Sequence, residues 1–214
     1  MNLILMEKRK LFEKINKKLK ELYPEAKIAL NFSNPWELLV AVILSAQTTD
    51  KKVNEITEKL FKKYKTIDDY AKVELREFEK DIKGVNYYKN KAKFILENAK
   101  IIKEKFNGKV PDTMEELLQL KGVARKTANI VLSVAYNKYE GIAVDTHVKR
   151  LTKILGLTKE TKPEKIEKDL MKIIPKGREW KDFPLRLIQY GRDFCPAKKH
   201  DHKNCPLTKI ISKK

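Results

Sequence analysis

The sequence contains little glycine, little cysteine and no long apolar run, and each shortage excludes a class of protein. Seven glycines among 214 residues are about half the usual share, which favours helices. Two cysteines are too few for a disulfide-dense secreted scaffold. No apolar run comes near the roughly 20 residues of a membrane span. The N-terminal MNLILMEKRK lacks the apolar stretch of a signal peptide, so the sequence predicts a soluble intracellular protein.

Acidic side chains are also short in supply relative to basic ones. The chain has 48 Lys and Arg against 29 Asp and Glu, a formal charge of +19. Such a surface attracts polyanions, of which nucleic acid is the commonest. A thermophile surface rich in Lys and Glu is the alternative, although an ion-pair network needs both signs in balance. The charge carries no information on sequence preference, because phosphate contacts carry none.

The apolar residues follow a helical period along most of the chain. They recur every three or four positions in the segments 11–22, 36–46, 53–64, 75–82, 92–106, 117–120, 128–135, 148–155, 166–173 and 183–190. Asn34-Pro35 and the capping boxes Thr113–Glu116 and Thr161–Glu164 mark helix starts. No alternation of period two occurs. We therefore predict an all-α chain with an irregular segment at 196–214.

The segment 117–132, LLQLKGVARKTANIVL, predicts two helices joined by a short turn at 121–124, the second helix starting near Arg125. Backbone N–H groups of such a turn, together with the start of the next helix, form an anion site. Gly122 lets a phosphate approach the backbone closely, and Lys121 and Arg125 add positive charge. An ordinary helical hairpin is the alternative.

This segment resembles the helix-hairpin-helix motif of the endonuclease III family of DNA glycosylases. Further stretches resemble family motifs in the same order along the chain: LSAQTTD (44–50), GVNYYKNKA (84–92), VPDTMEELLQL (110–120) and AVDTHVKRL (143–151). The resemblance spans nearly the whole chain. It implies an all-α, two-lobed fold with a DNA groove between the lobes.

The resemblance also implies how the chain is divided. Residues 1–26 form an N-terminal helix that packs with the C-terminal lobe. Residues 27–139 form a six-helix lobe with the helix-hairpin-helix at about 113–136. Residues 140–214 form the C-terminal helical lobe, which carries the catalytic aspartate and a degenerate cluster loop.

Two residues receive catalytic roles from the resemblance. Lys126 matches the lysine that attacks the sugar C1′, and it lies at a predicted helix start beside Arg125. Asp145 matches the carboxylate that stabilises positive charge on the sugar and assists proton transfer. A solvated side chain is the alternative for Lys126. A helix N-cap is the alternative for Asp145, and it is compatible with catalysis.

A further set of residues is implied to contact DNA. Gln47 would fill the gap left by a flipped nucleotide, and the second insertion loop would use Asn86 and Tyr87. The other implied contacts are Lys121, Gly122, Val123, Ala124, Arg125 and His147. The alternatives are a local amide bond for Gln47, core packing for Tyr87 or its neighbour Tyr88, and a local bond for His147.

Two of these positions hold another residue where relatives have glycine. Asn86 stands where relatives often have Gly, and Asn tolerates left-handed backbone better than most residues. Ala124 stands where the hairpin usually has Gly, and it costs something only if the position needs a positive φ.

The C-terminal segment departs most from the family. Many relatives hold a four-iron four-sulfur cluster with cysteines spaced C-x6-C-x2-C-x5-C. Here Cys195 and Cys205 take the first and third positions, but His202 and Ile211 take the others. Two thiolates are too few for such a cluster, so we predict that it is absent and that the protein has no cofactor. A zinc site formed by these cysteines with His200 and His202 and a Cys195–Cys205 disulfide are the alternatives.

The resemblance implies a base-excision repair enzyme that acts as a monomer on damaged or abasic double-stranded DNA, in the cytoplasm or at the nucleoid. It would be a DNA glycosylase with AP lyase activity that removes oxidised pyrimidines through a Lys126 Schiff base and β-elimination. A thymine or uracil mismatch glycosylase of the same superfamily is the first alternative. A non-catalytic helix-hairpin-helix DNA-binding protein is the second, and Lys126 with Asp145 argues against it because binding alone needs neither.

Overall fold

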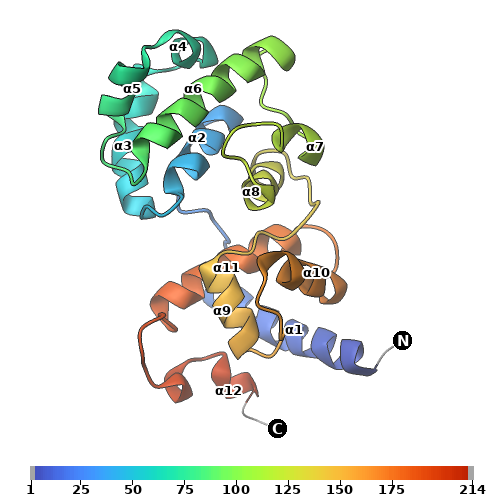
Figure 1. The fold of residues 1–214 in the computed structure, drawn as a ribbon. Helices are drawn as coiled ribbons and strands as arrows, with labels where there is room; N and C mark the ends of the chain where they lie inside the picture. Colours follow the sequence, from blue (N-terminus) through green and yellow to red (C-terminus); the bar gives the residue numbers. More distant parts are fainter. Residues whose placement is uncertain (1–2, 212–214) are drawn as a thin grey trace. The chain divides into compact units, whose positions relative to one another are not determined.

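The computed structural model describes residues 3–211, which form helices and connecting loops with no strand among them (Figure 1). The all-α prediction is confirmed for this part of the chain. The chain divides into two compact units. One is Ala29–Lys138, and the other joins the described residues of Met1–Ile28 and Tyr139–Lys214. Among the described residues, no helix has the length and apolar character needed to cross a membrane.

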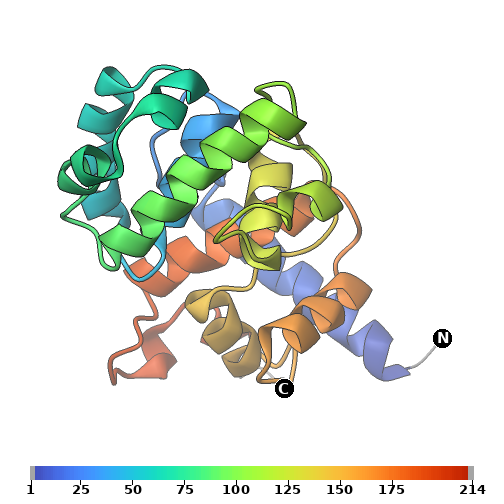
Figure 2. The ribbon, with the colours of Figure 1, turned by 45° about the horizontal axis from the view of Figure 1, so that its top comes forward.

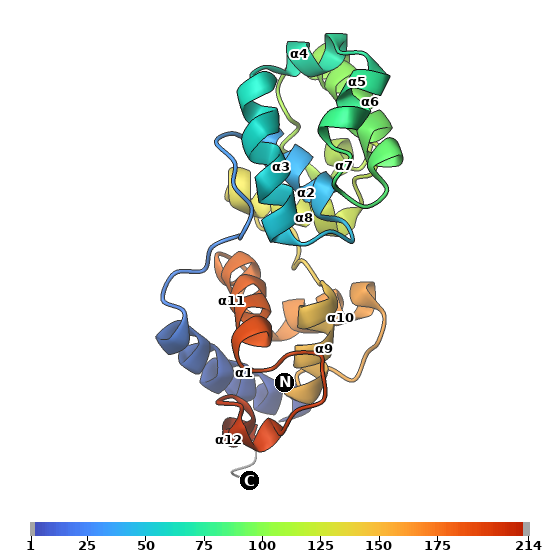
Figure 3. The same ribbon diagram turned by 90° about the vertical axis from the view of Figure 1, so that its left-hand side faces the viewer.

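The unit Ala29–Lys138 is built around one apolar helix. Its helices are α2 (Pro35–Ser45), α3 (Asp50–Lys63), α4 (Ile67–Lys72), α5 (Leu75–Asp81), α6 (Tyr88–Lys105), α7 (Met114–Leu117) and α8 (Arg125–Ala135). Helix α2 packs against α3, α6 and α8 (Figures 1 and 3). Eight of its 11 residues are buried, as a helix that is apolar all round requires.

The start of α2 follows its sequence signal closely. Asn34 caps the helix, since its side-chain oxygen accepts a hydrogen bond from Glu37 N at 2.9 Å, and Pro35 occupies the first helical position. Proline is tolerated there because its missing N–H would have no helical partner.

Helix α4 is one that the apolar spacing did not predict. Its six residues are too few for a helical stripe, but Thr66 and Asp69 form a complete capping box. Its single buried residue, Tyr70, packs on three other rings: Trp36 and Tyr64 with centroids at 5.2 Å, and Phe78 at 5.7 Å. Tertiary packing of one aromatic side chain therefore stabilises a helix whose length gives little stability of its own.

The other unit joins the two ends of the chain. It holds α1 (Leu3–Leu22), α9 (Thr146–Ile154), α10 (Pro163–Ile173), α11 (Glu179–Asp193), the 3₁₀ turn η1 (His202–Asn204) and α12 (Thr208–Ile211). Figure 2 shows blue α1 beside the orange and red C-terminal helices, and α1 contacts α10 and α11. Phe12 meets Phe183 with ring centroids 5.1 Å apart.

A buried guanidinium reinforces this packing. Arg186 of α11 donates to the carbonyl of Tyr23 at 3.1 Å and pairs with Glu179 at 3.2 Å. It also lies 3.6 Å from the buried carboxylate of Asp182. Burial of a charge is tolerated when its donors are satisfied in this way, so the segment after α1 is held to α11.

Two local predictions are wrong in this unit. The capping box at Thr161 does not form, because α10 starts at Pro163 with Lys162 as its N-cap and no side-chain cap bond. Proline at the first helical position determines the start in its place. The segment predicted to be irregular from residue 196 contains η1 and α12 within its described part, and residues 212–214 lie outside the described residues.

Candidate functional site

The hairpin predicted at Gly122 joins α7 to α8, and α8 starts at the predicted Arg125. Gly122 has φ +71°, and a Cβ added there would lie 2.6 Å from a ring carbon of Phe94. Both the left-handed backbone and the close ring exclude a side chain. The amide of Asn98 donates to the carbonyl of Lys121 at 2.9 Å and accepts from its N–H at 2.7 Å. Helix α6 therefore holds the turn in place.

The start of α8 lacks a side-chain cap. Ala124 is the N-cap residue, with φ −93° and ψ 170°. Because this φ is negative, alanine fits where relatives have glycine, and the departure costs no backbone strain. Ala124 makes no side-chain cap hydrogen bond, and the dipole at this helix start favours an anion. Buried Val123 anchors the turn, whereas Lys121 and Arg125 are exposed.

Lys126 lies in the first turn of α8 and is exposed. The opposite side of the helix, with Ala128, Val131 and Leu132, is buried, and α8 packs against α2. The lysine is thus carried by a helix whose other face is fixed in the core of its unit.

Asp145 caps α9 in the other unit. Its Oδ1 accepts a hydrogen bond from Val148 N at 2.8 Å, and its backbone is extended with φ −97°. Asp145 is half-buried, and Val144 and Val148 near it in the sequence are buried. The cap geometry therefore fixes the carboxylate in one orientation.

The loop of Gln47 and the loop of Asn86 are joined by hydrogen bonds. Asn86 donates from its side-chain amide to the carbonyl of Gln47. Its backbone N–H donates to Thr48 Oγ1 at 3.1 Å. Gln47 is exposed with φ 55°, a left-handed backbone that is uncommon for glutamine and tends to occur at functional sites. The two predicted insertion loops are thus joined to each other by hydrogen bonds.

The left-handed position of the second loop is Tyr87, one residue after the expected Asn86. Tyr87 has φ 57°, serves as the N-cap of α6 and is 64% exposed. Core packing, the alternative considered for the two tyrosines, is therefore wrong for Tyr87, and Tyr88 is half-buried. With the left-handed backbone at Tyr87, the side-chain amide of Asn86 bonds to the Gln47 loop. This bond accounts for the left-handed residue being Tyr87 and not the expected Asn86.

Lys91 is a site residue that the sequence analysis missed. Its Nζ donates to the carbonyls of Leu44 at 2.8 Å and Ala46 at 2.6 Å, and lies 3.3 Å from Thr48 Oγ1. Burial lowers the pKa of Lys91 to about 8. The lysine ties α6 to the end of α2 and so supports the Gln47 loop. A signal was present, because Lys91 lies four residues before Ile95 on the buried stripe of α6.

His147 lies in the first turn of α9 and is half-buried. A Cβ added at Gly191 of α11 would lie 2.5 Å from His147 Nδ1. The imidazole is therefore packed against the backbone of α11, in a place that only glycine leaves open.

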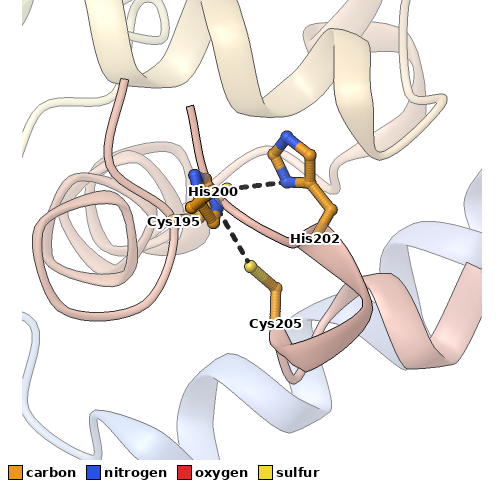
Figure 4. A group of neighbouring side chains, drawn as sticks. All are labelled: Cys195, His200, His202 and Cys205. Atoms are coloured by element: carbon orange, nitrogen blue, oxygen red, sulfur yellow. Dashed lines mark hydrogen bonds between the residues drawn. The ribbon is translucent and has the colours of Figure 1, made fainter. Parts of the chain in front are cut away.

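Four metal-ligating side chains gather at the C-terminal end of the chain (Figure 4). One ligand atom from each of Cys195, His200, His202 and Cys205 lies within 4.8 Å of all the others. Cys195 Sγ is 3.6 Å from His202 Nδ1, and His200 Nε2 is 3.3 Å from Cys205 Sγ. Both cysteines are buried and free. We call this group the C-terminal cluster.

The comparisons with known proteins agree with this set of features. Residues 40–176 match the HhH-GPD superfamily base excision DNA repair protein model. Endonuclease III of Synechocystis sp. is 47% identical over 192 residues, which cover 90% of this chain and 87% of the relative. Endonuclease III of Bacillus subtilis is 45% identical over 194 residues, which cover 90% and 88%. The chain belongs to the endonuclease III family.

Solved structures show the same likeness. The structure of a trapped endonuclease III–DNA covalent intermediate has a TM-score of 0.88 and 43% identity, and the match covers 94% of each chain. A thermostable thymine-DNA glycosylase has a TM-score of 0.80 at 24% identity, covering 95% of each chain, which shows a shared fold alone. The predicted family and helix-hairpin-helix glycosylase fold are confirmed. The protein is a base-excision DNA glycosylase with AP lyase activity that acts on double-stranded DNA.

The prediction that this endonuclease III family member has no cofactor is wrong. It rested on the two cysteines missing from the family's cluster motif and gave too little weight to the two histidines. The structure brings both histidines to both cysteines, with all four donor atoms inside 4.8 Å. Such a group can hold a metal ion.

Proposed function

We propose that this protein removes oxidised pyrimidines from duplex DNA, with Lys126 as the nucleophile and Asp145 as the assisting carboxylate. The observation that carries the proposal is the position of Lys126. It lies on the exposed first turn of α8, directly after a glycine turn and an uncapped helix start that suit a phosphate. The relative solved as a trapped covalent intermediate with DNA supports a covalent route.

The chemistry proceeds in two stages on the sugar. The neutral amine of Lys126 attacks C1′, the bond from C1′ to the base breaks, and the base leaves with a proton. The C1′–O4′ bond then breaks and O4′ takes a proton, so the sugar ring opens and the amine nitrogen is left in an imine with C1′. Loss of a C2′ proton breaks the C3′–O3′ bond, so that the strand is cut on the 3′ side of the lesion.

Asp145 supports these steps as a fixed negative charge. One carboxylate oxygen is engaged in the cap of α9, which holds the second oxygen in a set direction. A carboxylate held in this way stabilises the positive charge that develops on the sugar as the base departs. It also accepts and returns protons during attack and elimination.

The joined insertion loops would handle the flipped nucleotide. Gln47 is exposed on a backbone fixed by Asn86 and Lys91, so its side chain can enter the duplex with little loss of entropy. Tyr87, which follows Asn86 in the sequence, is also exposed. The turn at 121–125 would bind a phosphate, and His147 would contact the DNA from the start of α9.

Borohydride trapping tests the nucleophile. The wild-type protein with duplex DNA containing an abasic site is expected to form a covalent adduct, and Lys126→Gln is expected to form none. Lys100→Gln, which alters an exposed lysine of α6 in the same unit, is the matched control and should trap normally. An adduct with Lys126→Gln, or none with the wild type, would refute the assignment.

A lesion panel tests the substrate. Matched duplexes carry an oxidised pyrimidine, an oxidised purine, or thymine or uracil opposite guanine. We expect the oxidised pyrimidine to be released fastest under single-turnover conditions. Faster release of thymine or uracil from the mismatches would assign the protein to the mismatch glycosylases.

A further inference from the structure

The four side chains of the C-terminal cluster differ from the donor set that the family resemblance implies. A four-iron cluster normally takes four thiolates, and this chain offers two thiolates and two imidazoles. The family's fourth cysteine position holds Ile211, whose side chain cannot bind a metal. The four-thiolate arrangement therefore does not fit these residues.

We propose that Cys195, His200, His202 and Cys205 bind a single zinc ion. Tetrahedral zinc with bonds of about 2.3 Å to sulfur and about 2.0–2.1 Å to nitrogen places neighbouring ligand atoms about 3.3 to 3.8 Å apart. The two sulfur–nitrogen distances of 3.6 and 3.3 Å fall within or at the edge of this range. Two thiolates and two neutral imidazoles form a ligand set that zinc commonly takes.

The pairing of unlike ligands favours one ion over a two-iron cluster. In a two-iron centre with two cysteines and two histidines, both cysteines bind one iron and both histidines bind the other. Thiols and imidazoles would then be farther from each other than like ligands are. Here each thiol lies against an imidazole, the two imidazole rings have centroids 4.3 Å apart, and all four donor atoms lie within 4.8 Å of one another, as the ligands of one ion would (Figure 4).

The orientation of His200 supports the same conclusion. Its Nδ1 lies 2.8 Å from the carbonyl of Lys198, and its Nε2 faces Cys205 Sγ at 3.3 Å. Metal-bound histidines commonly have their second nitrogen fixed by a carbonyl in this way.

The zinc site would also hold α9. Arg150 of α9 donates to the carbonyl of Cys195 at 2.6 Å and lies 3.6 Å from its Sγ. The Cys205 thiol donates to the carbonyl of Phe194 at 3.1 Å, at the end of α11, and a zinc ion would take the place of this proton. Zinc binding therefore closes residues 195–205 onto α9 and α11. Since α9 begins at Asp145, the ion acts as a positioning element for the carboxylate proposed above, and this last step rests on the proposed function.

Metal analysis of untagged protein, purified without added metal, tests the site. We expect about one zinc ion per chain, no acid-labile sulfide and no visible absorption. His202→Ala removes the exposed ligand, which should disturb folding least, and is expected to lose the zinc. His147→Ala removes the other histidine of the chain and should keep it. Iron with acid-labile sulfide, a Cys195–Cys205 disulfide, or free thiols without metal would each overturn the proposal.

Spectroscopy and stability give readouts that do not depend on activity. Cobalt exchanged into the site should show the absorption of tetrahedral cobalt bound to thiolates. Chelation should lower the Tm by about 5 °C or more, and zinc but not magnesium should restore it. Backbone amides of α9 should then exchange faster with deuterium. Absent zinc refutes the site, whereas normal zinc binding with a failed trapping experiment would refute only the catalytic assignment.

Discussion

Replacement of Asp145 separates its two roles, as the cap of α9 and as a catalytic carboxylate. Asparagine keeps an oxygen that can accept from Val148 N, where the wild-type bond is 2.8 Å, and asparagine caps helices about as well as aspartate. It loses only the interaction of the charge with the helix dipole, about 0.3–1 kcal/mol. Alanine loses the cap as well, which adds about 1 kcal/mol.

The two roles predict that Asp145→Asn and Asp145→Ala differ in stability but are alike in their loss of rate. Asp145→Asn should lower the free energy of unfolding by no more than about 1 kcal/mol, and Asp145→Ala by about 1–2 kcal/mol. Both should lower the single-turnover rate of base release by at least about 100-fold, because both remove the negative charge. Thr66→Ala, which removes the cap of α4, is the control: it should cost about 1 kcal/mol and leave the rate unchanged. If Asp145→Asn released the base at close to the wild-type rate, Asp145 would be a cap alone.

Three further outcomes follow from the other unit. Gln47→Ala should slow release of a paired lesion by about 10-fold or more while changing strand cutting at abasic sites less, because only the former requires a base to be unpaired; equal losses would argue against the insertion role. Gly122→Ala should destabilise the protein by about 1–3 kcal/mol, as measured by chemical denaturation, and should weaken DNA binding, as measured by titration. Both effects should be larger than those of Gly108→Ala, because Gly108 has the same φ of +71° but nothing within 4 Å of an added Cβ. Burial lowers the pKa of Lys91 to about 8 from its ordinary value of 10.5, so between these pH values the unfolded chain binds more protons and the folded state gains stability as the pH rises. The free energy of unfolding of the wild type should therefore increase over this window relative to that of Lys91→Met, whose side chain does not titrate. A decrease would refute the burial of this ammonium group.

Most helices could be predicted because their signals are local. Residues 36–44 are almost all apolar, which indicates a central helix whatever the rest of the chain does. Arg125 follows a glycine turn, and α8 begins there. Signals that compete with one another are less secure: at the start of α10, Pro163 overrode the capping box at Thr161.

The contacts of the insertion loops could not be predicted because they join distant segments. Lys91 and the carbonyl of Leu44 are 47 positions apart, and no local pattern states that this lysine points inward. A lysine is rarely buried unless its donors are satisfied. The position of Lys91 on the apolar stripe of α6 was the single sequence signal that its side chain is buried. The left-handed backbone at Tyr87 is likewise set by the bonds from Asn86 to the neighbouring loop.

The C-terminal cluster shows why counting ligands falls short of predicting a site. Cys195 and Cys205 are ten positions apart, and the reach of the histidines between them depends on how the chain turns. That turn is built from short-range bonds: Asp201 accepts from Lys203 N at 2.9 Å, and Thr208 Oγ1 donates to the carbonyl of Cys205 at 2.8 Å. They flank η1, in which Cys205 N donates to the carbonyl of His202 at 3.1 Å. Cys205 and His200 then meet with Sγ 3.3 Å from Nε2. A motif search compares types of residue at fixed spacing, whereas a metal responds to donor atoms in space. A chain that lacks two cysteines of the family motif can therefore still present four ligands to one ion.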